Sequence, residues 1–181
     1  MRAIICVFLL LISAAGATAA MQEATRDELT LVIKDVKPAG VVTVEMNNSS
    51  QKPLRVWNEA NTWGDAHWRV LLIRDGRLET FFENPGQMFT MNYPRFDEIA
   101  VGAKIDRELG LNNGGWCGFG HCSQFGEHGF AGREVSFEHG DILIVIYDVP
   151  KLLINPESKG SVMAVKAGVW YGVATAMTVV E

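Results

Sequence analysis

The sequence predicts an all-β protein, an antiparallel β-sandwich, on three observations. Short runs of β-branched and apolar residues recur along most of the chain. Turn signals separate these runs about every eight to twelve residues. No window shows the 3.6-residue periodicity of an amphipathic helix. Roughly eight short strands spaced in this way are typical of two antiparallel sheets packed face to face.

The first strands are expected at residues 29–33 and 41–46, where β-branched residues alternate in part with polar ones. The turn signal Lys-Pro-Ala-Gly at residues 37–40 lies between them. The polar stretch 47–53 predicts a second, longer turn. A third strand follows at residues 54–57, where apolar and polar residues alternate.

A hairpin is expected in the middle of the chain. Residues 68–73 alternate as a strand, and Asp75 and Gly76 follow as a turn, since this dipeptide favours the positive φ angles of two-residue hairpins. Residues 78–82 would form the returning strand. The composition of residues 105–109 fits a strand and a short helix equally, so the sequence predicts one or the other.

The last third of the chain contains its most apolar segment and its most glycine-rich one. Residues 141–147 are apolar almost throughout, so we expect them in the centre of a sheet. Residues 169–180 predict a long final strand with a bulge at Gly172. Residues 110–132 hold eight glycines, which predicts a long surface loop.

The first twenty residues have the layout of a cleavable export signal. Arg2 precedes the apolar stretch 3–12, and small residues follow at 13–20. Removal of this signal near Ala20 leaves residues 21–181, which is the length of one domain. The sequence therefore predicts a secreted or periplasmic protein.

The charge balance excludes several classes of partner. The chain has 16 basic and 21 acidic residues, and loss of Arg2 leaves 15 against 21, a net charge of −6 with neutral histidines. A mildly acidic chain without a basic run argues against nucleic acid and anionic membranes. No second apolar stretch is long enough to predict a membrane span in the mature chain.

Two cysteines remain after the signal, because Cys6 lies within it. Cys117 and Cys122 are close in sequence inside the glycine-rich segment. A pair of this kind in an exported protein predicts one disulfide. The closed loop is short, so the chain-entropy model gives at most about 2–3 kcal/mol.

A metal site is the alternative for the same segment. Cys117, His121, Cys122 and His128 are residue types that bind zinc or copper. An oxidised cysteine pair supplies no thiolate, which leaves a histidine site at His121 and His128 as the alternative. We expect no cofactor in the favoured interpretation.

The tryptophans give the candidate ligand-binding residues. Trp57 and Trp68 are expected to point inward from strands. Trp63, next to Asn61 in a polar stretch, and Trp116 in the glycine-rich segment are the candidates for an exposed aromatic site. The alternative for Trp63 and Trp116 is that both fold back over the end of the sandwich.

No motif predicts catalysis. The chain has no Gly-x-Ser-x-Gly elbow and no phosphate-binding Gly-Lys-Ser/Thr loop. We therefore expect no enzyme activity and no catalytic residue.

Residues 44–57 join a strand, a polar Asn-Ser turn and a proline that opens the next strand. With the steps at 92–94, 101–104 and 169–172, this pattern resembles exported bacterial immunoglobulin-like domains and, more weakly, proteinase-inhibitor-like sandwiches. The resemblance covers residues 29–180 and implies an immunoglobulin-like sandwich, with no functional residue transferred. The chain departs from the pattern in its glycine-rich insertion, and it lacks the Cys…Trp…Cys spacing of antibody domains.

The sequence thus predicts an exported, non-catalytic binding module that recognises a protein or a cell-envelope glycan through its loops. The alternatives are a metal-binding or electron-transfer sandwich and a secreted proteinase inhibitor. Asn47 and Asn48 both begin glycosylation sequons, whose use the sequence leaves open.

Overall fold

The computed structural model describes residues 28–58, 67–83, 95–112, 115–118, 121–122, 134–155, 160–163 and 168–181. These residues contain strands and no helix, and therefore no helix that would be able to cross a membrane. The strands are β1 Leu29–Lys37, β2 Val41–Asn48, β3 Leu54–Trp57, β4 Trp68–Arg74, β5 Arg77–Glu83, β6 Phe96–Ile99, β7 Lys104–Gly110, β8 Trp116–Gly118, β9 His121–Cys122, β10 Ile142–Val149, β11 Leu152–Asn155, β12 Gly160–Met163 and β13 Gly172–Val179.

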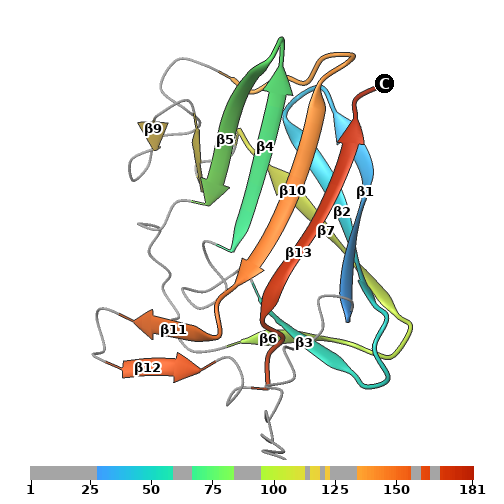
Figure 1. The fold of residues 1–181 in the computed structure, drawn as a ribbon, viewed down its shortest axis with the longest axis vertical. Coiled ribbons are helices and arrows are strands. Elements are labelled where there is room, and N and C mark those ends of the chain that lie inside the picture. Colours follow the sequence, from blue (N-terminus) through green and yellow to red (C-terminus); the bar gives the residue numbers. More distant parts are fainter. Residues whose placement is uncertain are drawn as a thin grey trace, which may run out of the picture.

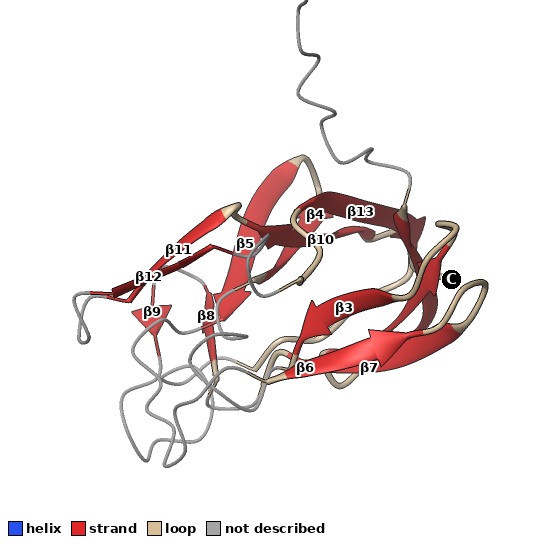
Figure 2. Cartoon of the chain, turned by 90° about the horizontal axis from the view of Figure 1, so that it is seen from below, coloured by secondary structure: helices blue, strands red, loops and turns tan. Residues whose placement is uncertain are grey.

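The strands form antiparallel sheets in two layers, an arrangement consistent with a β-sandwich (Figures 1 and 2). One layer contains the three-stranded sheet β1-β2-β7 and the short pair β3-β6. The other contains the six-stranded sheet β13-β10-β4-β5-β8-β9. The predicted all-β class is confirmed, and residues 105–109 belong to strand β7 rather than to a helix.

The core lies between the two layers because alternate residues of each strand point inward. In β2 and β10 every second residue is buried, and the residues between them are only half-buried. Trp57 and Trp68 both lie in this core, as predicted. Trp68 packs against Tyr147 of β10 with 4.6 Å between ring centroids, and Tyr147 stacks on Trp170 at 5.9 Å.

The predicted hairpin between β4 and β5 is present. Asp75 and Gly76 form its two-residue turn with φ angles of 50° and 73°. Positive φ at both positions gives the twist that joins two antiparallel strands directly. Because Asp and Gly both tolerate these backbone angles, the local sequence was sufficient to predict this hairpin.

Three expectations for the irregular parts of the strands were wrong. The glycine-rich segment is a loop only in part, because Trp116–Gly118 forms β8, a buried strand that pairs with β5. The final strand begins at Gly172, and its pairing with β10 has no register shift. The register shift in the described sheets lies instead in β1, between Ile33 and Asp35.

The side chain of Asn48 joins the two parts of the first layer. Its Nδ2 donates to the carbonyl oxygens of Lys52, Ile99 and Ala100 at 2.8, 2.9 and 3.1 Å. Its Oδ1 accepts from the backbone N–H of Ser50 at 2.9 Å. The residue is 2% exposed. Asn48 therefore closes the corner where β2 ends and β7 begins.

A partly buried ion pair connects the end of β4 to the residue that precedes β10. Arg74, at the end of β4, binds Asp141 through two hydrogen bonds of 2.8 and 2.6 Å. Asp141 is buried and also accepts from the backbone N–H of Glu138 at 2.8 Å. The Arg74 guanidinium lowers the pKa of the Asp141 carboxyl, and that carboxylate raises the pKa of Arg74.

A candidate interaction surface

The outer face of the six-stranded sheet is apolar over four strands. Register places side chains of β13, β10, β4 and β5 in rows across this face. The first row is Val179, Ile142, Ile73 and Leu78, and the second is Met177, Ile144, Leu71 and Thr80. We call the nine apolar side chains of these rows and the next the apolar face: Leu71, Ile73, Leu78, Phe82, Ile142, Ile144, Ile146, Met177 and Val179.

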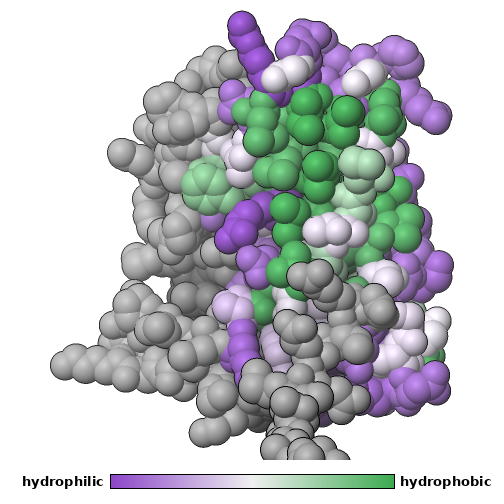
Figure 3. Space-filling model, viewed as in Figure 1, coloured by the Kyte–Doolittle hydropathy of each residue, from purple (hydrophilic) through white to green (hydrophobic). Residues whose placement is uncertain are grey.

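These side chains are in contact with solvent in the described structure. Met177 is 69% exposed, Leu78 59% and Val179 55%, and the isoleucines of β10 are half-buried by their neighbours. Figure 3 shows the hydrophobic residues gathered over β4, β10 and β13. A large contiguous apolar patch is unusual on a monomer and marks an interaction site.

The outer face of the other layer has the opposite chemistry. There Lys34 binds Asp106 at 2.9 Å, Lys104 binds Glu45 at 2.8 Å, and Lys37 binds Glu108 at 3.1 Å.

These ion pairs shift two ionisation equilibria. The hydrogen bond from Lys104 lowers the pKa of Glu45, and the hydrogen bond to Asp106 raises the pKa of Lys34. Charged residues of both signs are typical of a sheet face that water covers. The chain therefore has one outer sheet face that carries charged residues and another whose residues are apolar, like those of a protein core.

The apolar face becomes polar at one end. Its third row contains Thr175, Ile146, Arg69 and Phe82. Arg69 lies next to Asp148 of β10 and binds it at 3.1 Å, with both side chains partly exposed. The two ends of the apolar face therefore differ, since one is apolar throughout and the other carries one ion pair.

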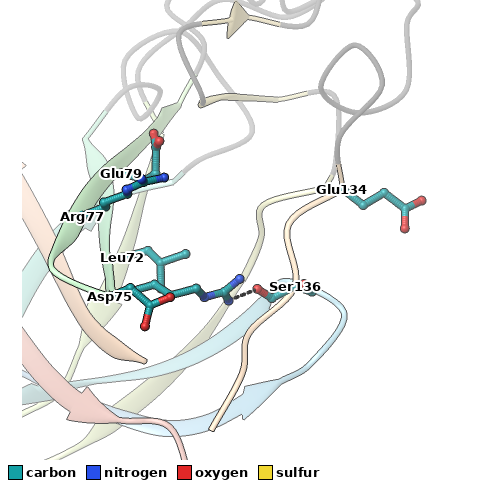
Figure 4. A pocket seen from close by; sticks show the side chains of 7 residues that line it. Leu72, Asp75, Arg77, Glu79, Glu134 and Ser136 are labelled. Atoms are coloured by element: carbon teal, nitrogen blue, oxygen red, sulfur yellow. Dashed lines mark hydrogen bonds between the residues drawn. The ribbon is translucent and has the colours of Figure 1, made fainter. Parts of the chain in front are cut away.

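A polar pocket of about 430 Å³ lies beside the β4–β5 hairpin. Its described lining is Leu72, Arg74, Asp75, Arg77, Glu79, Glu134 and Ser136 (Figure 4). Arg74 donates to the Ser136 carbonyl at 2.7 Å and to Glu138 at 2.8 Å as well as to Asp141. This arginine is fully engaged in holding the 134–141 segment, and the described lining contains no histidine or cysteine. The pocket therefore offers less chemistry for a site than the apolar face does.

The predicted aromatic site is only partly within the described residues. Trp116 is 6% exposed and belongs to the core, so within the described residues it is not an exposed aromatic side chain. It is buried because β8 adds to the edge of the sheet and turns the indole inward. Asn61 and Trp63 lie outside the described residues.

The predicted cysteine pair falls at the far edge of the same sheet. Cys117 of β8 and Cys122 of β9 are directly opposite each other in register, and Cys117 is buried. His121 is in β9, and His128 lies outside the described residues. Among the residues the structure describes, no group of three or more His, Cys, Asp or Glu is placed to hold a metal ion.

Sequence reasoning missed the apolar face, although a signal for it was present. Residues 142–146 are Ile-Leu-Ile-Val-Ile, so both faces of β10 are apolar. Such a run predicts a strand covered on both sides. Among the residues that the structure describes, one side of β10 is buried and the other is half-buried.

Comparisons with family models, curated proteins and solved structures find no match to this chain.

Proposed function

We propose that the chain is an exported, non-catalytic binding module of immunoglobulin-like topology that recognises a protein partner through its apolar face. The observation that carries this proposal is the contrast between the two outer faces of one molecule. One is covered with ion pairs, and the other with isoleucine, leucine, valine and methionine.

The strand order supports the immunoglobulin-like part of the proposal. The sheet β1-β2-β7 corresponds to the order A-B-E, and β13-β10-β4-β5 corresponds to G-F-C-C′. The chain departs from that plan by adding β8 and β9 beyond β5 and by inserting the β3-β6 pair. The first twenty residues support export.

The chemistry of the apolar face favours a protein over a glycan. Sugars bind to exposed aromatic rings bordered by hydrogen-bonding groups, whereas the central rows here are aliphatic. The burial of Trp116 removes one of the two aromatic residues on which the glycan interpretation depended. The metal-binding and proteinase-inhibitor alternatives stay predictions, because their loops lie largely outside the described residues.

A disulfide between Cys117 and Cys122 belongs to the proposal. Directly opposed residues of antiparallel strands have Cα atoms about 4.5–5.5 Å apart. A disulfide needs Cα atoms about 4.4–6.8 Å apart. The register of β8 and β9 therefore supports a bridge that fastens β9 to the sheet edge.

Photo-crosslinking in the producing cell tests the binding surface. A photoreactive amino acid replaces Met177 on the apolar face or, as the matched control, Val32 on the charged face. Both positions are exposed, at 69% and 46%. We expect discrete protein adducts from position 177 and none from position 32. Equal adducts from both positions, or none from either, would contradict the proposal.

A further inference from the structure

We infer that the protein bound by the apolar face is a second copy of this chain, in a face-to-face dimer whose two-fold axis runs parallel to the strands. The inference rests on the proposed function, since it names the partner of the same surface. Three features carry it: the area of the face, its unbroken four-strand register and the position of the Arg69–Asp148 ion pair.

The exposed apolar surface area of the face is close to the area that one partner buries in a stable protein complex. Half-exposed and exposed side chains of the apolar face leave on the order of 600 Å² of apolar surface in water. A standard interface takes about 800 Å² from each partner, rim included. Two copies paired through this face therefore reach the standard size once the polar rim is added.

The shape suits a second sheet better than a groove-binding peptide. The face consists of four neighbouring strands without a register shift between them, so it is one continuous sheet surface. Two sheets pack face to face about 10 Å apart with their mean strand directions within about 30° of each other. The molecule already contains one such packing in its own core, where buried residues of the two layers form one cluster (Figure 2).

The polar end determines the direction of pairing. A two-fold axis between β10 and β4, parallel to the strands, places β10 of one copy over β4 of the other. The apolar rows of the two copies then coincide. Arg69 of each copy lies beside Asp148 of the other, next to the existing contact of 3.1 Å within each chain. An axis across the strands would instead press this ion pair onto the apolar end of β4 and β10, at Ile73 and Ile142, at a desolvation cost.

Sedimentation velocity of the purified chain, from low micromolar to several hundred micromolar, measures the self-association. We expect twice the mass of one chain at the upper end. Ile144→Lys, at the centre of the face, should raise the dimer Kd at least about 100-fold, because the lysine would lose its water in the interface. Val32→Lys should leave the Kd within about twofold. Circular dichroism of both variants verifies the fold.

A charge-reversal pair tests the direction of the two-fold axis. Arg69→Asp and Asp148→Arg each place like charges together within a chain and across the dimer, so each should weaken the homodimer. Mixing the two variants should give a heterodimer tighter than either homodimer, because every cross-copy contact is then of opposite sign. A mixture no tighter than the homodimers would overturn the proposed orientation.

The outcomes separate this inference from the proposed function. A chain that sediments as one copy at every concentration, while position 177 crosslinks to a different protein, overturns the second-copy partner and keeps the binding surface. A single copy with no adduct from position 177 overturns both. Adducts between two chains of this protein, abolished by Ile144→Lys, support both.

Discussion

Asn48 is a polar side chain whose burial is explained by the contacts it makes. It lies at a strand end and donates to three backbone carbonyls, that of Lys52 between β2 and β3 and those of Ile99 and Ala100 at the end of β6. The same geometry bears on its sequon. A glycan attaches through Nδ2, and in the folded chain that atom is buried and engaged.

Replacement of Asn48 by alanine should lower the free energy of unfolding by about 2–4 kcal/mol, because buried carbonyl oxygens lose their donor. Urea denaturation followed by tryptophan fluorescence measures the change. Asn47→Ala, one residue earlier on the outer side of β2, is the matched control and should stay within about 0.5 kcal/mol. Equal losses in the two variants would show that Asn48 has no special role.

Asp141 gives the fold a pH dependence of known sign. Arg74 lowers the pKa of Asp141 below its usual range in the folded chain. A carboxyl with a lowered pKa stabilises the fold above its unfolded pKa of about 4, and this stability is lost as the pH falls through the folded value. The ion pair therefore contributes fully at neutral pH and disappears in acid.

Asp141→Asn should cost about 2–4 kcal/mol at pH 7, because it removes the buried carboxylate partner of Arg74 and leaves the guanidinium paired with the exposed Glu138 alone. The difference from the natural chain should shrink as the pH falls below about 4, because the carboxyl takes up a proton there in the unfolded chain, and in the folded chain only at its lowered pKa. Thermal unfolding across this pH range measures both. A difference that stays constant with pH would exclude the ion pair as its cause.

At the scale of elements, two glycine turns separate the cost of a steric clash from the cost of a left-handed backbone. Gly40, between β1 and β2, and Gly76, between β4 and β5, have nearly the same φ, 74° and 73°. A Cβ at Gly40 would lie 2.7 Å from the carbonyl oxygen of Val135 and 2.8 Å from Nδ2 of Asn112. A Cβ at Gly76 would meet nothing within 4 Å.

Gly76→Ala should therefore cost about 1 kcal/mol, which is the price of a left-handed backbone for an L-residue alone. Gly40→Ala should cost about 3 kcal/mol or more, since the turn must also move away from the 134–137 segment. Paired denaturation curves give both values. Equal costs would mean that the β1–β2 turn does not pack against Val135.

The β8–β9 hairpin carries the proposed disulfide. If Cys117 and Cys122 are bridged, the mass of the exported chain is lower by two hydrogens and neither cysteine alkylates after denaturation. Reduction should then cost about 2 kcal/mol, because the closed loop is short. Free thiols that alkylate at once on denaturation would refute the bridge.

At the scale of the whole molecule, the two outer faces differ in their response to solvent. Pairing through an apolar face should tighten in sulfate, which strengthens apolar burial, and should weaken on cooling. Sodium chloride should change the dimer Kd by less than about threefold, because only the Arg69–Asp148 end is ionic. Sedimentation in the two salts measures this. A dimer that dissociates steeply in sodium chloride would locate the contact on the charged face instead.

Local sequence predicted the elements whose residues favour one backbone conformation. Asp75 and Gly76 gave the hairpin, residues 54–57 gave β3, and the inward positions of Trp57 and Trp68 followed from alternation. It failed at Trp116, because glycines disfavour an isolated strand, whereas pairing with β5 stabilises one. The register shift in β1 also depends on its pairing with β2, and this pairing cannot be read from the residues of β1 alone.

The sequence by itself determined the all-β class, the β4–β5 hairpin and the inward positions of Trp57 and Trp68, because these depend on residues close together in the chain. The tertiary structure decided which outer face is charged and which is apolar. That distinction depends on which strands become neighbours, since Met177, Ile144 and Leu71 form one row only after β13, β10 and β4 pair. Residues 142–146 show that both sides of β10 are apolar, but no single strand records which neighbours complete the surface.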